Sequence, residues 1–369
     1  MSRFYLLIML ATAACRPSGS SGGAMGGTGS EEETGGSNAG GAAEAGGSVG
    51  QPGTDAGGGE SGATVGGNGG KVTVPGADAG ADVGIPLSPI DLPRALRAQP
   101  ETYARLVGFP EGVSWRKDGS VLVCQPMLSR IAPDKKRTRL LGFNCLGSVV
   151  MGDGALLITG QAGLYRVAPD GKVAILAEAT GANDLSVDRM GAVFFTAAGS
   201  VHRYLPDGQH HTLTGNIGAN GIEVDPDSRF VYVTRPGMNT VNRFALPANA
   251  TTTVQSAPYL TNVPFPDGAA FDAHGNLWLA LHQAKQIGIY DVVSKKELGR
   301  IPVPVETTVQ NLAFGGAAFD QLFVVGGNYD ANAMIVRFAV GVAGFPTNPG
   351  ATAYVPLRML ADTVNEVAF

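Results

Sequence analysis

Oxygen-bearing side chains recur at one position of a phrase that this sequence repeats. The stretch FPEGVSWRKDGSVLV begins at Phe109, and FPDGAAFDAHGNLWLA begins at Phe265. Both place a carboxylate after Phe-Pro and a glycine after the carboxylate. Four further copies, two of them weaker, align with these two, and the six copies start 35 to 47 residues apart. The aligned position holds Glu111, Leu146, Asn183, Asn220, Asp267 and Gln310.

This repeated position offers ligands for a hard divalent cation. If the copies meet around one axis, the carboxylates of Glu111 and Asp267 converge there with the carboxamides of Asn183 and Asn220, and no His or Cys joins them. Such donors suit Ca²⁺ or Mg²⁺ rather than Zn²⁺ or Cu²⁺, and irregular oxygen cages completed by water favour Ca²⁺. Asn or Asp before Gly is also common in turns, so a single copy carries no information. The in-phase set of four favours a metal site.

The elements that must position these residues are the blades of a β-propeller. Each copy has a short alternating run, a tight turn rich in Asp or Gly, and a β-rich run such as FVYVT or NLWLAL. Further short strands lie between the copies, at 163–176 and 200–213 for example. Four strands per period of about 40 residues are typical of a blade whose first strand lines a central channel. The sequence therefore predicts an all-β, six-bladed β-propeller, closed by an outer strand from the stretch ETYARLVGF before Glu111.

The motifs also resemble those of a known family, the senescence marker protein/gluconolactonase (regucalcin-like) family. The phrases that carry the resemblance span about residues 109–330, in family order: PEGVSW, GANDLSV, ANGIEVDPDSRFVYVT, FPDGAAFDAHGNLWLA and AFGG. The resemblance implies a six-bladed propeller with one catalytic divalent ion in its channel. It also implies hydrolysis of lactones or organophosphates, which members of the family carry out. It implies that Glu111, Asn220 and Asp267 are metal ligands, and that Asn183 binds the metal or contacts the substrate.

The expected function is calcium-dependent hydrolysis of a lactone or related ester. The ion would polarise the carbonyl group and stabilise the oxyanion, while Asp267 activates water or attacks directly. The alternative is a non-catalytic propeller that binds a ligand or partner around a structural ion, because a fold does not determine a function. A metal-free relative of strictosidine synthase is disfavoured by the full set of oxygen donors.

Two residues near the expected channel mouth could contact a substrate. Arg235 follows YVT, where the family commonly has Asp, and could bind an anionic substrate or be a surface charge. His282 follows the strand after Asp267 and could assist proton transfer or simply pack. The segment after FFTA is short where relatives often have a substrate-covering loop, which predicts a more open pocket and does not favour sugar lactones in particular.

The first 85 residues are expected to lie outside the propeller. Residues 1–14 fit a signal peptide, and ATAAC resembles a bacterial lipobox with Cys15 as the lipidated residue, an ordinary secretory signal being the alternative. Residues 15–85 are rich in Gly and lack aromatics, so we expect a disordered tether that leaves 86–369 for the propeller. Both interpretations export the chain, and Arg16 after Cys15 favours the outer membrane over the inner.

Charge and cysteine content set further bounds. The net charge is −5, and the basic run DKKRTR at 134–139 is expected to be a solvated loop, so nothing indicates nucleic-acid binding. Cys124 and Cys145 could form a disulfide in an exported chain or remain two buried thiols. The sequence alone does not decide between these two states.

Overall fold

The computed structural model describes residues 92–246, 256–328, 332–346 and 354–360. The predicted signal peptide, the Cys15 lipidation site and the whole predicted tether precede these residues and lie outside them. Strands dominate the described ranges, where the helices are the short α2 (Leu92–Leu96) and the 3-10 turn η1 (Pro236–Met238). Within these ranges neither helix approaches the length and apolar content needed to cross a bilayer.

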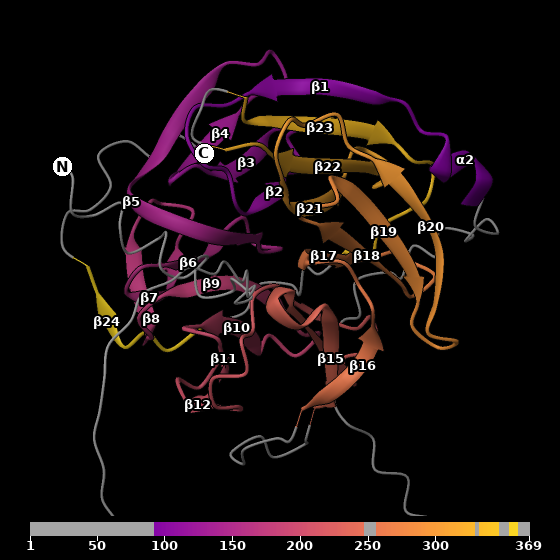
Figure 1. Cartoon of the computed structure of the whole chain (residues 1–369). Coiled ribbons are helices and arrows are strands. Elements are labelled where there is room, and N and C mark those ends of the chain that lie inside the picture. Colours follow the sequence, from indigo (N-terminus) through magenta and orange to yellow (C-terminus); the bar gives the residue numbers. More distant parts are fainter. Residues whose placement is uncertain (1–91, 247–255, 329–331, 347–353, 361–369) are drawn as a thin grey trace, which may run out of the picture. The chain divides into compact units, whose positions relative to one another are not determined.

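The strands form antiparallel blades that follow one another around an axis, as Figure 1 shows. Three blades are separate sheets whose strands are consecutive in the chain. The third blade comprises β9 (Ala182–Val187), β10 (Val193–Ala197), β11 (Ser200–Tyr204) and β12 (His210–Thr212). The fourth comprises β13 (Ile222–Val224), β14 (Phe230–Arg235), β15 (Thr240–Ala245) and β16 (Ala257–Thr261). The fifth comprises β17 (Pro266–Phe271), β18 (Asn276–Leu281), β19 (Gln286–Asp291) and β20 (Lys296–Pro302).

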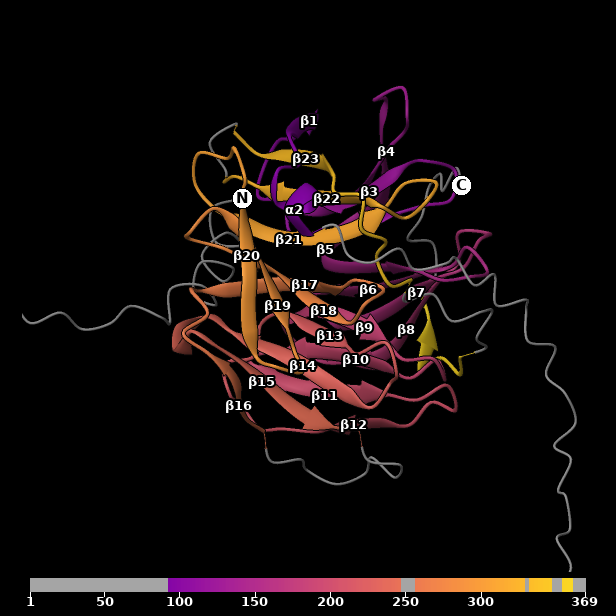
Figure 2. The same ribbon diagram turned by 90° about the vertical axis from the view of Figure 1, so that its right-hand side faces the viewer.

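The first and second blades share one long strand, β5 (Arg137–Val150), and so form a continuous sheet. Residues 137–144 of β5 pair with β4, whereas residues 145–150 pair with β6. The other strands of the first blade are β2 (Val113–Trp115), β3 (Val121–Cys124) and β4 (Met127–Ile131). Those of the second are β6 (Leu156–Gly160), β7 (Gly163–Val167) and β8 (Val173–Glu178). The eight-stranded sheet is therefore two blades, with β24 (Arg358–Met359) added beside β8 (Figure 2).

The sixth blade closes the ring with a strand from the other end of the domain. It contains β21 (Val309–Gly315), β22 (Gln321–Gly326) and β23 (Met334–Ala339), with β1 (Pro100–Arg105) as its outer strand. β1 pairs antiparallel with β23, with Glu101 opposite Arg337. The predicted all-β six-bladed propeller and its closure by the stretch before Glu111 are both confirmed.

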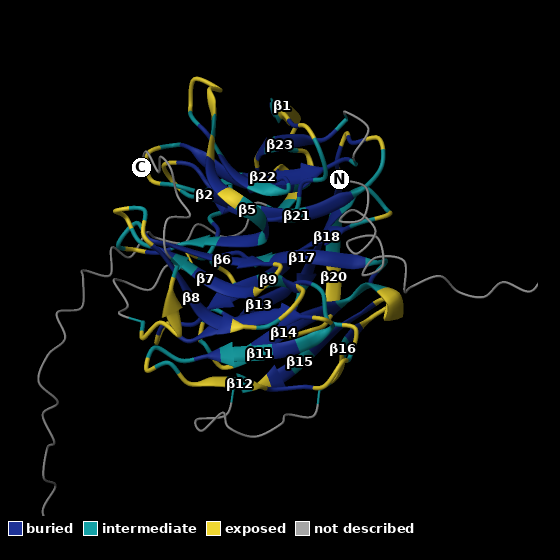
Figure 3. Cartoon of the chain, turned by 90° about the vertical axis from the view of Figure 1, so that its left-hand side faces the viewer, coloured by how far each residue is buried: buried dark blue, intermediate teal, exposed yellow. Residues whose placement is uncertain are grey.

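Apolar side chains pack between neighbouring blades rather than in one central core. Six clusters of buried residues each join two adjacent blades, and the sixth-to-first cluster contains Tyr103 of β1. The second strands of four blades, β3, β6, β10 and β18, are buried along their whole length, and dark strands of this kind dominate Figure 3. This explains why runs such as VFFTA and NLWLAL are continuously apolar, since both faces of each blade are covered.

A second recurring feature of the repeat, the Asp after the first strand, closes the turn to the second strand. Asp188 accepts hydrogen bonds from the backbone N–H groups of Met190 and Ala192 at 2.9 and 2.8 Å. Asp272 likewise accepts from His274 and Asn276 and also binds Trp278 Nε1 at 2.9 Å. An Asp side chain that captures backbone N–H groups is a common way to fix a turn. These acids are therefore structural, in contrast to the acid at the start of the phrase.

Cys124 and Cys145 form a disulfide with their Cα atoms 5.3 Å apart. The bond joins β3 of the first blade to β5 where that strand enters the second blade. It lies next to the repeated position, because the Cys124 carbonyl accepts from Glu111 N–H at 2.9 Å and Cys145 immediately precedes Leu146. The open question about this pair is thus resolved in favour of pairing.

We expect the double variant Cys124→Ser/Cys145→Ser to lose about 3 kcal/mol of unfolding free energy, because the bond closes a short loop in the unfolded chain. Denaturant unfolding with circular dichroism measures this difference. A reductant should lower the midpoint of the native protein and leave that of the double variant unchanged. Equal midpoints for the two oxidised proteins would contradict a stabilising role for the bond.

Candidate functional site

The repeated residues lie where the first strands of the six blades begin. These strands, β2, the second half of β5, β9, β13, β17 and β21, contact one another in sequence around the axis. Asn183, Asp267 and Gln310 are each the second residue of their strand, and Glu111 and Asn220 precede theirs by two residues. Because all six strands run in the same sense along the channel, these side chains belong to one end of it.

A glycine after the repeated residue lets the first strands approach closely. A Cβ atom on Gly221 would lie 2.2 Å from the Asp267 carbonyl oxygen, and one on Gly112 would lie 2.6 Å from the Leu146 carbonyl oxygen. The second approach is closed by a hydrogen bond from Gly112 N–H to that same oxygen at 2.6 Å. Glycine therefore follows the repeated residue because any larger residue there would collide with the neighbouring blade.

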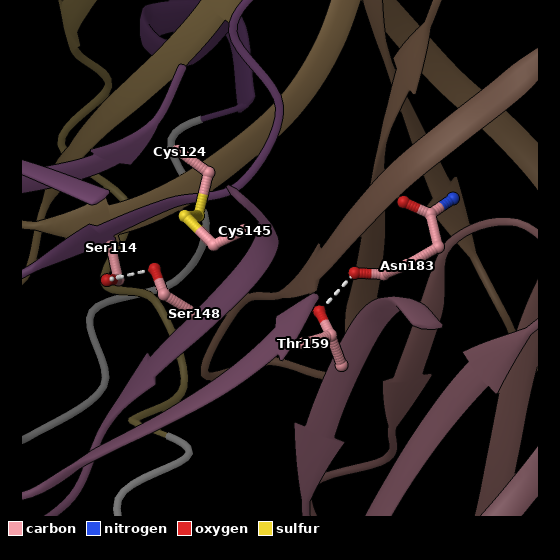
Figure 4. Close-up of a disulfide and its surroundings, with 6 residues drawn as sticks. All are labelled: Ser114, Cys124, Cys145, Ser148, Thr159 and Asn183. Atoms are coloured by element: carbon pink, nitrogen blue, oxygen red, sulfur yellow. Dashed lines mark hydrogen bonds between the residues drawn. A yellow bond between two sulfur atoms is a disulfide. The ribbon is translucent and has the colours of Figure 1, made fainter. Parts of the chain in front are cut away.

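Two threonines hold the carboxamide residues from the preceding blade. Thr159 Oγ1 of β6 donates to the Asn183 carbonyl, as Figure 4 shows, and Thr196 Oγ1 of β10 donates to the Asn220 carbonyl at 2.6 Å. Figure 4 also places the disulfide and the Ser114–Ser148 hydroxyl pair of the first two blades near this point. The side chains of the two asparagines meet, since Asn183 Nδ2 donates to Asn220 Oδ1 at 2.6 Å.

Four carboxyl groups gather in the channel, of which the sequence pattern identified two. Burial and then the charges of Asp267 and Asp184 raise the pKa of Glu111 well above its ordinary value. Burial and Asp184 likewise raise the pKa of Asp267, whose side chain is deeply buried. Burial raises the pKa of Asp184 to about 6, and burial with the charge of Asp184 raises that of Glu223. No ion pair among the described residues involves any of the four.

Sequence reasoning missed Asp184, Glu223 and Asn311, although a signal for each was present. Asp184 directly follows the repeated Asn183, and Asn311 directly follows Gln310, so both stand one residue deeper along a first strand. Glu223 stands three residues after Asn220, so all three residues follow the repeated position by an odd number of residues and, by the two-residue period of a strand, share one phase that differs from that of the repeated residue. The three line the same cavity, and Asn311 hydrogen-bonds Asp184. Comparing the residues one and three positions after the repeated residue in every copy would have found them.

The channel itself is narrow. A cavity of about 90 Å³ lies among the first strands, with Asp184, Glu223 and Asn311 on its wall together with Ser114 and Ser148. Phe345 also lines it. The segment that carries Phe345 leaves the sixth blade and bonds back to the fifth, with Phe345 N–H donating to the Phe271 carbonyl at 2.9 Å. Phe271 ends β17, so this segment lies at the end of the channel opposite Asp267.

The residues at the mouth fit a divalent cation on their own chemistry. They offer several carboxylates with no cationic partner, which a divalent ion would neutralise. Asn220 Oδ1 retains a lone pair beyond its bond to Asn183, and Gln310 Oε1 is buried with no hydrogen-bond partner among the described residues. The structure brings no three His, Cys, Asp or Glu of those residues into a preformed metal cage. A cation here would therefore take amide oxygens and water as well as carboxylates.

Arg235, the last residue of β14, and His282, in the turn after β18, both lie on the side of the channel where the repeated residues begin. Arg235 ends β14 and its Nε donates to the Ile217 carbonyl, so part of its guanidinium is already engaged. His282 follows β18, and its ring packs against Phe265 with centroids 5.4 Å apart. Burial lowers the pKa of His282 to about 4, so the imidazole is neutral at neutral pH, and its Nδ1 is buried without a partner in the described structure. A neutral His282 can hydrogen-bond a ligand but does not supply a cationic acid.

The comparisons with known proteins agree with this architecture. A family model described as the SMP-30/gluconolactonase/LRE-like region matches residues 109–328. A luciferin-regenerating enzyme superposes with a TM-score of 0.57 at 21% identity, covering 70% of this chain and 100% of its own. A calcium-binding protein, regucalcin, from Agrobacterium tumefaciens gives 0.58 at 20% identity, with 68% and 97% covered. A gluconolactonase from Xanthomonas campestris gives 0.57 at 22% identity, with 68% and 93% covered. No curated protein sequence matches the chain significantly.

We expect Gly221→Ala to weaken divalent-cation binding and to cost about 1–3 kcal/mol of stability, because its new methyl group would push β13 away from Asp267. Gly215→Ala is the matched control, since a Cβ atom there meets no atom within 4 Å. Calorimetric titration with Ca²⁺ and thermal unfolding measure the two effects. Gly221→Ala behaving like Gly215→Ala would show that the close approach of the strands is unimportant.

The carboxyl cluster predicts a pH dependence of stability that calcium should reverse. A carboxyl group with a raised pKa in the folded state favours folding below its unfolded pKa of about 4, and this contribution is lost as the pH rises through the folded value. Metal-free protein should therefore become less stable as the pH rises from about 4 through the value of about 6 for Asp184 and beyond. Added Ca²⁺ should raise the melting temperature more at pH 8 than at pH 5. A calcium effect that is independent of pH would argue against binding at these carboxylates.

Proposed function

The chain belongs to the SMP-30/gluconolactonase/LRE-like family, and we propose that it is a calcium-dependent hydrolase of lactones or related esters. One observation carries the proposal: four carboxyl groups without a cationic partner gather at one channel, and two of them are repeated residues of the family-matched region. The regucalcin neighbour is described as calcium-binding and another neighbour as a gluconolactonase. These descriptions support the choice of ion and of substrate class for this chain.

In this proposal Glu111, Asn220 and Asp267 hold the ion, with Asn183 as a further ligand or substrate contact. Bound Ca²⁺ would supply a Lewis acid that polarises the ester carbonyl and stabilises the negative charge developing on its oxygen. Asn183 would present its Oδ1 to the ion or to the substrate, because its Nδ2 donates to Asn220 and its backbone carbonyl accepts from Thr159.

Asp267 is the proposed general base. Its carboxylate would accept a proton from the attacking water while the water oxygen bonds to the carbonyl carbon. The ester C–O bond then breaks, and the proton passes from Asp267 to the leaving alkoxide, giving a hydroxy acid. A metal-bound carboxylate is ordinarily a weak base, but burial and the nearby Asp184 raise the pKa of Asp267 and oppose that weakness. Asp184 is thus a positioning and tuning residue rather than a catalytic one.

We also propose that the protein acts outside the cytoplasm, tethered through Cys15. The Cys124–Cys145 disulfide supports an oxidising compartment, in which such bonds form and persist. Mass spectrometry of the membrane fraction tests the anchor. We expect a lipid on Cys15, and an unmodified Cys15 would contradict the proposal.

The central test is acid release from a panel of lactones and esters with Ca²⁺, after chelation, and with Ca²⁺ restored. We expect activity that disappears on chelation and returns with the ion, and that Glu111→Gln lowers by at least about a hundredfold. Glu178→Gln is the control, because Glu178 is exposed and pairs with Arg358 on the outer side of the second blade. No hydrolysis of any substrate, with Ca²⁺ still raising thermal stability, would replace this proposal with a binding propeller that carries a structural ion.

A further inference from the structure

A second and much larger cavity lies at the other end of the first strands. It measures about 1030 Å³ and is lined by the turns that connect first and second strands in three blades, at 115–119, 151–154 and 316–319. The repeated residues stand at the opposite ends of the same strands, so about five residues, or roughly 17 Å, separate this cavity from Glu111. It adjoins the narrow channel cavity, with which it shares Trp115, Val150 and Phe319, and lies at the end away from the proposed catalytic mouth.

The charge of this cavity is opposite to that of the protein. Its wall carries Arg116, Lys117, Lys135 and Arg337 against the single carboxylate of Asp118, in a chain whose net charge is −5. A local excess of cations on an acidic protein is a feature of a site for anions rather than of general surface composition.

The lysines of the cavity lack carboxylate partners. Asp118 lies 3.8 Å from Arg116 and 3.0 Å from Arg130, and Arg337 pairs with Glu101 of the closing strand. Neither Lys117 nor Lys135 forms an ion pair with any described residue. Two ammonium groups at the rim of one cavity thus remain available to an anion from solution.

Lys135 is directed to the cavity by an aromatic ring. Its Nζ lies 3.3 Å from the centroid of the Tyr103 ring, and the Arg337 guanidinium lies 5.9 Å from the same centroid. Partial burial and the charge of Arg337 lower the pKa of Lys135, so its ammonium group is held beside a like charge. The basic run at 134–139, expected to be only a solvated loop, therefore contributes one residue to a defined site.

Aromatic side chains supply an apolar surface beside these cations. Trp115 and Phe319 pack edge to face, with ring centroids 5.9 Å apart, and both are partly exposed. Tyr103 packs in the same manner on Phe323, at 5.2 Å. A flat apolar group can lie against such rings while a charged group reaches the lysines.

We propose that this cavity binds an organic anion, whose carboxylate or phosphate contacts Lys117 and Lys135 and whose flat apolar part lies against Trp115 and Phe319. The site is independent of the channel ion and of the proposed hydrolysis. Its ligand would be recognised by one negative group and one planar apolar group together.

The two tryptophans of the chain make this proposal directly measurable. Trp115 lines the cavity, whereas Trp278 is fully buried between the fifth and sixth blades and donates to Asp272. Titration of the full chain with phenylacetate or phenyl phosphate, in chelator and at physiological ionic strength, should change Trp115 fluorescence saturably. The neutral analogue phenylacetamide should bind with an affinity at least about tenfold lower. Whichever of the two anions binds with the higher affinity shows whether carboxylate or phosphate is the preferred group.

Charge-neutral variants locate the binding. Lys135→Gln and Lys117→Gln should each weaken binding of the anion, by about fivefold to tenfold, whereas Lys136→Gln on the same loop, exposed and outside the cavity, should not. Lys117 is itself exposed, so its variant keeps the test valid if Lys135→Gln does not fold. The proposal is overturned if no anion gives a saturable change up to about 10 mM. It is equally overturned if phenylacetamide binds as well as phenylacetate, or if Lys136→Gln weakens binding as much as Lys135→Gln.

Discussion

The close approach of six first strands around one axis is the constraint on which the rest of the structure depends. Neighbouring backbones come so near that Gly221 faces the Asp267 carbonyl and Gly112 bonds the Leu146 carbonyl. Each blade must then be apolar on both faces, and six separate clusters of buried side chains fill the spaces between blades. The closing strand β1 and the disulfide at Cys124 brace the ring beside its first repeated acid.

The same convergence has an electrostatic cost that explains the proposed chemistry. Side chains at the starts of six strands converge, so burial raises the pKa of Glu111, Asp184, Glu223 and Asp267, and the charge of Asp184 raises that of the other three further. Replacing such groups with apolar residues would stabilise the fold, so retaining them indicates a function, as buried titratable groups often do. In the proposed function, a divalent cation would relieve the repulsion between the carboxylates and would also contact the ester carbonyl oxygen. The far end of the channel carries an excess of positive charge, so the two proposed sites would select ligands of opposite charge.

Much of this architecture could be predicted from the sequence because a propeller repeats its own signals. The period, the turn aspartates and the alternating runs located the six blades, and the stretch before Glu111 proved to be the closing strand. Other features depend on contacts between distant residues. The pairing of Cys124 with Cys145 requires a separation that no spacing reveals. The addition of β24 to β8 and the path of Phe345 across the channel end are likewise set by packing after the last blade. The sequence showed Lys135 only as one member of a basic run, and its contact with the Tyr103 ring, which places it at the cavity, is visible only in the structure.

In the candidate site too, some residues could be predicted from the sequence and others only from the folded structure. Alignment of the repeats identified Glu111, Asn183, Asn220 and Asp267, of which the structure brings the two asparagines into a hydrogen bond and the two acids into electrostatic contact. The deeper acids required the strand period as well as the repeat. The proposed roles of these residues, and of Arg235 and His282, stay predictions.

The most direct test is a crystal structure of the protein grown with calcium, with the ion located by its anomalous scattering. The account predicts one ion within about 2.3–2.6 Å of carboxylate oxygens of Glu111 and Asp267 and of Asn220 Oδ1, with at least one position held by water and open to a substrate. An ion whose positions are all filled by protein oxygens would support the structural role instead. The absence of an ion from this mouth at saturating calcium would contradict the central claim.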